Sequence, residues 1–107
     1  MTKNVRVASI SFSGVGRASG ARETVRRNLE AMSGLLEKAY YDEADIACFP
    51  ETSPTIGLSI EESVALAEPV PGSIFNFFSN RASEYNMNII LPMLGLQRGM
   101  CITQRSL

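Results

Sequence analysis

Glu51 directly follows a short apolar segment in the stretch ADIACFPETSP, residues 44–54, and is the most suggestive reactive side chain of this sequence. Pro50 lacks the N–H that an interior strand donates, so the segment should be a buried strand that ends there. A carboxylate at the edge of an apolar core can have a raised pKa and act as a general base near neutral pH. The alternative is that Glu51 caps the next turn or faces solvent, because perturbed carboxylates also occur in structural networks.

The other reactive side chains are few. The sequence has no histidine, which excludes Ser-His-Asp and Cys-His arrangements within it and removes the commonest metal ligand. Cys48 and Cys101 do not form a C-x-x-C pair, and Cys48 is expected to be a small buried apolar residue. Lys3 and Lys38 are expected to be solvated. Because the carboxylates are not clustered, we expect neither a metal ion nor another cofactor.

Alternating strands and helices should position these side chains. Residues 5–12, VRVASISF, are rich in β-branched residues and predict a strand, and a Gly- and Ser-rich loop follows. Residues 45–49 predict a second strand. Between them, apolar residues at helical spacing predict an amphipathic helix over residues 22–41. The apolar positions of this helix are Val25, Leu29, Met32, Leu36 and Ala39.

The second half of the sequence predicts two helices and a third strand. Ser59 and Glu62 form a capping box for a short helix that Pro69 should end. Ser73 is expected to cap a helix to about Asn86, and residues 86–95, NMNIILPMLG, predict a strand. This order predicts an α/β fold with about three strands and two to three helices. Residues just past the carboxyl ends of strands line the functional crevice of such sheets.

Composition restricts the classes of function. The 107 residues suit one domain, and a formal net charge of -1 gives no electrostatic reason to bind nucleic acid or an anionic membrane. No apolar run approaches the length of a membrane span, and the first residues, MTKNVRVASI, lack the pattern of a secretory signal. A cytoplasmic protein is the expectation.

The ordered set NVRVASISF, NLEAMSGLLEKA, ADIACFPE, AEPVPGS and YNMNIILPMLG resembles the first part of the nitrilase, or carbon-nitrogen hydrolase, superfamily. The resemblance covers roughly residues 4 to 95. It implies a partial carbon-nitrogen hydrolase domain over residues 1–95 and a divergent C-terminal tail over residues 96–107. The implied fold is the N-terminal portion of an αββα sandwich.

The resemblance also implies a chemistry. Family members hydrolyse non-peptide carbon-nitrogen bonds of small amides or nitriles with a Glu, Lys and Cys set, in which the cysteine thiolate attacks carbon. Only Glu51 matches a catalytic position, because the family lysine and cysteine come from strands further along. Cys101 lacks the aromatic, acidic and arginine neighbours of the family nucleophile. We therefore expect a truncated hydrolase domain that is inactive alone.

Two alternatives remain open at this stage. Family members form dimers, so the chain could be a non-catalytic interaction module that forms a homo-oligomer or pairs with a full-length homologue. The sheet face built from Val7, Ser9, Ile46 and Ile90 would lack the second sheet that covers it in a sandwich. A weaker alternative is a nucleotide-binding unit, because glycines at 14, 16 and 20 approximate a phosphate loop. The acidic residue that binds the ribose in such a unit is expected about 20 residues after the loop, whereas Glu51 lies 31 positions after Gly20.

Overall fold

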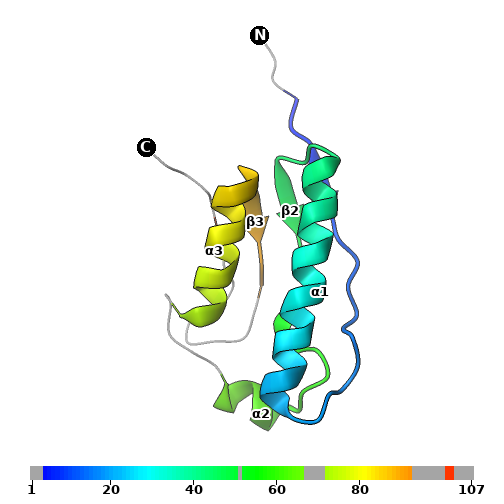
Figure 1. Ribbon diagram of the computed structural model, residues 1–107, viewed down its shortest axis with the longest axis vertical. Helices are drawn as coiled ribbons and strands as arrows, with labels where there is room; N and C mark the ends of the chain where they lie inside the picture. The colour runs from blue at the N-terminus through cyan, green and yellow to red at the C-terminus, as the bar shows by residue number, and fades with distance from the viewer. Residues whose placement is uncertain (1–3, 51, 67–71, 93–100, 103–107) are drawn as a thin grey trace.

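The computed structural model describes residues 4–50, 52–66, 72–92 and 101–102. The strands are short, and long helices connect them (Figure 1). The elements in chain order are β1 (Val7–Ser9), α1 (Ala21–Tyr41), β2 (Ile46–Cys48), the 3-10 turn η1 (Ser53–Thr55), α2 (Ile60–Ala65), α3 (Ser73–Tyr85), β3 (Asn88–Ile90) and β4 (Cys101–Ile102).

One sheet with the order β1-β2-β3-β4 contains every described strand. The first three strands are parallel, as their α-helical connections require, and β4 is antiparallel to β3. The α/β fold predicted from the sequence is therefore confirmed. The strand β4 was not predicted, and it lies within the segment that was expected to be a divergent tail.

Two predicted boundaries, the extent of the first strand and the N-cap of α3, differ from the structure. The first strand was predicted over residues 5–12, but β1 contains only Val7–Ser9, and one further ladder bond joins the N–H of Ile10 to the carbonyl of Cys48 at 2.9 Å. The interior strands β2 and β3 have three residues each as well, so the ladder is short across the whole parallel part of the sheet. Ser73 was predicted to cap α3, yet the N-cap is Gly72 and Ser73 is the first helical residue.

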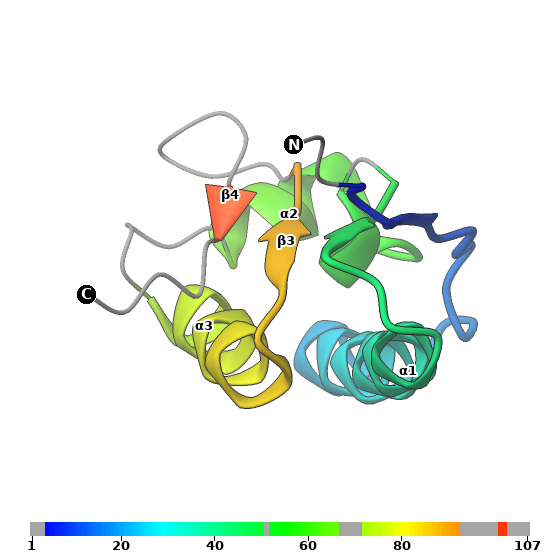
Figure 2. The same cartoon turned by 90° about the horizontal axis from the view of Figure 1, so that it is seen from above.

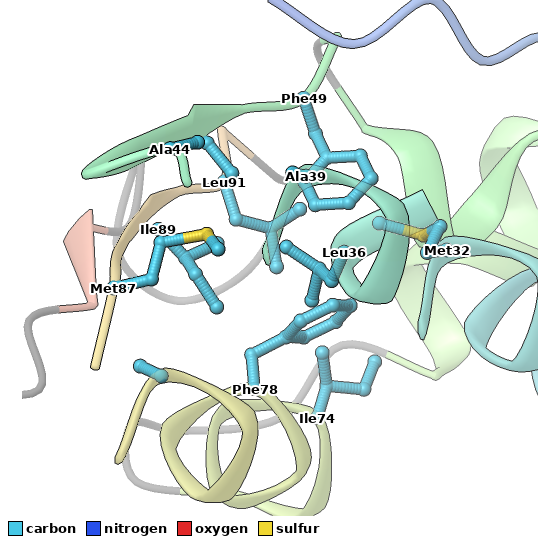
Figure 3. Close-up of a cluster of buried hydrophobic side chains, with 12 residues drawn as sticks. Met32, Leu36, Ala39, Ala44, Phe49, Ile74, Phe78, Met87, Ile89 and Leu91 are labelled. Carbon is cyan, nitrogen blue, oxygen red and sulfur yellow. The ribbon is translucent and has the colours of Figure 1, made fainter. Parts of the chain in front are cut away.

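Helices α1 and α3 cover the same face of the sheet, which Figure 2 shows from above. Ala47 and Ile89 point into this layer and are fully buried there. Met32 and Leu36 of α1 and Phe78 of α3 pack against them, so the predicted apolar faces of both helices form one core (Figure 3). The predicted amphipathic helix and the predicted capping box at Ser59 are both confirmed.

The opposite face of the sheet is open to solvent. Val7 is 55% exposed and Ile90 is 37% exposed, while their neighbours along the strands, Ala8 and Ile89, are more buried. Ser9 is also exposed. Among the described residues, the pattern agrees with the expected exposure of apolar side chains on this sheet face. Of the helices described, none has both the length and the apolar character needed to cross a membrane.

Candidate functional site

The carboxyl ends of β1, β2 and β3 meet at one edge of the sheet because the three strands are parallel. In Figure 1 this edge faces the end of the molecule where α2 and the start of α1 lie. Glu51, the candidate catalytic residue, lies outside the described residues. Its neighbours Pro50 and Thr52 are described, and they follow β2 at this edge.

Hydrogen bonds fix the main chain on both sides of position 51. The N–H of Phe49 donates to the carbonyl of Ile90 at 3.0 Å, and the N–H of Thr52 donates to the carbonyl of Pro92 at 2.7 Å. The hydroxyl of Ser53 donates to the carbonyl of Pro50 at 2.7 Å. The loop after β2 is therefore tied to the end of β3 just before and just after Glu51.

Thr52 has a left-handed backbone, with φ 54° and ψ 31°. A β-branched residue rarely adopts this conformation, which costs roughly 1–2 kcal/mol for an L-residue. Such strain persists where the surrounding structure imposes it, and it is concentrated at functional sites. The residue that directly follows Glu51 is therefore held in a strained conformation.

The loop after β1 packs against the loop after β2. Gly14 has φ +89°, and a Cβ atom there would lie 2.6 Å from Cγ2 of Ile56, so only glycine permits this approach. Arg17 donates from Nη1 and Nη2 to the two carboxylate oxygens of Glu62, at 2.6 and 2.7 Å. The hydrogen bonds from Arg17, followed by that from the main-chain N–H of Ser59, lower the pKa of Glu62 to about 2. The two loops and α2 thus form one connected rim.

An open hollow of about 270 Å³ lies beside this rim, between residues 52–58 and the start of α2. Its lining combines the side chains of Ile56, Leu58 and Ile60 with hydroxyl-bearing residues such as Thr55 and Ser63. Its volume lies just below the usual range of small-molecule sites, which is about 300–1,000 Å³. An apolar wall with a few polar groups is the usual lining of such sites.

The other reactive residues considered from the sequence lie elsewhere. Lys38 is exposed in the last turn of α1, at the opposite end of the sheet, which confirms the expectation that it is solvated. Cys48 was expected to be buried, but it is half-buried on the open face between Ser9 and Ile90. The side chain of Cys101 and all of Lys3 lie outside the described part. No metal-binding group of three His, Cys, Asp or Glu residues occurs within the described ranges.

Two polar residues of α1 are buried that were not predicted from the sequence to have a structural or functional role. Thr24 and Asn28 are fully buried on the same stripe as Met32, one helical turn apart. The hydroxyl of Thr24 accepts the N–H of Ala18 at 3.0 Å, and Oδ1 of Asn28 accepts the N–H of Val15 at 3.2 Å. A phosphate loop needs such N–H groups for its ligand, so these bonds do not favour the nucleotide-binding alternative. The sequence signal that could have revealed these two residues is their polar character at positions where helical spacing predicts apolar ones.

Comparison with known proteins identifies the class. The family model of the carbon-nitrogen hydrolases matches residues 6–105. No curated protein matches the chain. The crystal structure of the C. elegans NitFhit protein is similar in fold, with a TM-score of 0.60 and 19% sequence identity over 81% of this chain and 19% of that chain. The chain thus spans about a fifth of the length of that structure.

The chain belongs to the carbon-nitrogen hydrolase family. Its described part is a three-stranded parallel sheet with helices on one face and one antiparallel edge strand, which agrees with a portion of the nitrilase fold. The resemblance inferred from the sequence is therefore confirmed. The family match extends to residue 105 and includes β4, so it reaches into the segment expected to diverge.

Proposed function

We propose that this chain supplies the general base, Glu51, of a carbon-nitrogen hydrolase that acts on small amides or nitriles. The observation that supports this best is the fixed main chain around position 51, where Thr52 is bonded to Pro92 and held in a strained conformation. A base must be positioned within hydrogen-bond reach of the proton that it removes, so such restraint serves catalysis.

The proposed reaction is nucleophilic hydrolysis of a carbon-nitrogen bond. For an amide, Glu51 takes the proton of the cysteine thiol, and the thiolate attacks the carbon. Glu51 then gives this proton to the nitrogen, which leaves as ammonia, and takes a proton from the water that hydrolyses the resulting thioester. A lysine stabilises the tetrahedral intermediates. Lys38 lies at the other end of the sheet, and Cys48 faces away from the helices. We infer that residues 1–107 form a partial domain, inactive alone, which needs a lysine and a cysteine from the remainder of a complete domain.

The decisive experiment measures ammonia release from simple aliphatic amides and nitriles. We expect no turnover by the isolated chain, and turnover when it is combined with the downstream portion of a homologous hydrolase. Glu51→Gln should lower the recovered rate by about 10²- to 10⁴-fold, the usual contribution of a general base. Glu61→Gln, an exposed carboxylate on α2, is the matched control and should leave the rate unchanged.

Two results would contradict this proposal. Glu51-dependent turnover by the isolated chain would show that the partial domain is catalytically complete. An undiminished rate of the Glu51→Gln variant in the combined system would show that Glu51 is not the base.

The open sheet face favours a second candidate, a non-catalytic interaction module. Val7 on β1 and Ile90 on β3 expose apolar surface on this face, and Ile46 lies on β2, the strand between them. Exposed apolar patches of this kind are typical of association surfaces. A full-length homologue is the proposed partner. Size-exclusion chromatography with and without that homologue tests this candidate, and a well-folded monomer that never co-elutes would count against it.

A further inference from the structure

Asn28 connects three separate segments from inside the protein. It lies on α1 with no solvent-exposed surface. Its Nδ2 donates to the carbonyls of Pro54 at 3.0 Å and Ile56 at 2.9 Å, and its Oδ1 accepts the N–H of Val15 at 3.2 Å. One side chain therefore holds both loops that form the rim of the carboxyl edge.

The chemistry of the amide suits this position closely. An asparagine offers two N–H donors and one carbonyl acceptor, and here both donors and the acceptor are used. The reversed amide would place Oδ1 against two carbonyl oxygens, so the partners fix its orientation. Burial of an amide is unfavourable unless it is hydrogen-bonded. A leucine would fill the same helical stripe, but it would leave the carbonyls of Pro54 and Ile56 without this donor. Packing alone does not explain an asparagine here.

The restraint from Asn28 reaches the residues next to Glu51 through a short chain of bonds. Pro54 is three positions after Glu51, inside the turn in which the N–H of Thr55 donates to the carbonyl of Thr52 at 3.0 Å. The hydroxyl of Ser53 in the same turn donates to the carbonyl of Pro50. A shift of the turn would therefore move the main chain on both sides of Glu51.

We propose that Asn28 is a positioning residue, which sets the loop after β2 and, through that loop, the reach of Glu51. This inference rests on the proposed role of Glu51. It assigns Asn28 no contact with substrate. Thr24, one turn earlier, is the natural comparison. It is equally buried, and the bonds of its hydroxyl within the described part of the chain go to Ala18 and Gly20 of the loop after β1.

Amide hydrogen exchange, measured by NMR on the 107-residue chain, tests this proposal without any need for turnover. Asn28→Asp keeps the acceptor for Val15 but turns an oxygen toward the carbonyls of Pro54 and Ile56. We expect exchange at the N–H groups of Thr52 and Thr55 to become at least about tenfold faster, a loss of roughly 1.4 kcal/mol of local protection. The ladder N–H groups of Ile10 and Phe49 should keep their protection.

The control and a second variant make the result decisive. Thr24→Val, of similar shape, should leave exchange at Thr52 and Thr55 unchanged. Asn28→Ala leaves room for water and is the variant to use if Asn28→Asp does not fold, with the same selective loss expected. Equal acceleration of all N–H groups would overturn the proposal, because Asn28 would then contribute only to overall stability. A different result would separate this proposal from the proposed role of Glu51. If protection were lost at Thr52 and Thr55 alone, but Glu51→Gln did not change the hydrolysis rate of the combined system, Asn28 would position the loop and Glu51 would not be the base.

Discussion

Ile89 and Ile90 are adjacent residues of β3 with opposite environments, and they provide a direct test of the open sheet face. Ile89 is fully buried among the side chains that α1 and α3 contribute, as Figure 3 shows, whereas Ile90 is 37% exposed on the other face. Successive side chains of a strand point to opposite faces of the sheet. The substitutions Ile89→Ala and Ile90→Ala therefore remove the same atoms from one strand and differ in surroundings alone.

The expected magnitudes follow from burial. Removal of a fully buried isoleucine side chain to alanine costs about 2–5 kcal/mol, because apolar contacts are lost and a cavity remains. Ile90 keeps over a third of its surface in water in the folded chain, and no closed cavity forms when it is shortened, so about 1 kcal/mol is expected. A domain of this size has a free energy of unfolding of roughly 5–15 kcal/mol, so the first variant loses a large share of its stability.

Urea denaturation followed by circular dichroism, at several protein concentrations, measures both free energies of unfolding. The reasoning would be refuted if Ile90→Ala cost as much as Ile89→Ala at every concentration, because Ile90 would then be covered within the monomer. If the cost of Ile90→Ala instead grew with protein concentration, a second molecule would cover this face, as the interaction-module candidate requires.

Two further predictions concern the rim. Gly14→Ala should lower the free energy of unfolding, measured by urea denaturation, by about 1–3 kcal/mol more than Gly16→Ala. Both glycines have positive φ, but only a Cβ at Gly14 would meet Ile56. Equal losses in the two variants would contradict this close approach. Because the folded pKa of Glu62 is about 2, below the ordinary 4.5, its ion pair with Arg17 should stabilise the fold above about pH 4.5 and lose this effect as pH falls toward 2. The stability difference between wild type and Arg17→Gln should shrink over that range, and a constant difference would disprove the assignment.

The long helices were predictable because their apolar periodicity is carried by local residues. The stripe from Met32 through Leu36 to Ala39 specifies a buried helical face wherever the partner lies. The ends of the strands were less predictable. Residues 5–12 are rich in residues that suit a strand, but the length of the ladder depends on the partner strand. The partner β2 has only three residues, and β1 pairs with these three.

The site was predictable only in part. Proline after an apolar run indicated where β2 ends and thus which edge Glu51 follows. The carbonyls that Asn28 binds could not be deduced, because they belong to residues 26 and 28 positions further along, and no local pattern encodes such pairs. The left-handed backbone of Thr52 is likewise imposed by its tertiary environment, since threonine has no intrinsic preference for it.

Placement of the base and closure of the sheet face depend on different parts of this chain. Bonds from Asn28 of α1 and from the end of β3 hold the main chain around Glu51. None of them involves the exposed side chains of Val7 or Ile90 on the open face. The main chain around Glu51 is therefore held without any contact from the side chains of that face. In the hydrolase proposed above, the lysine and the cysteine would then meet a carboxylate whose flanking main chain is already held by hydrogen bonds.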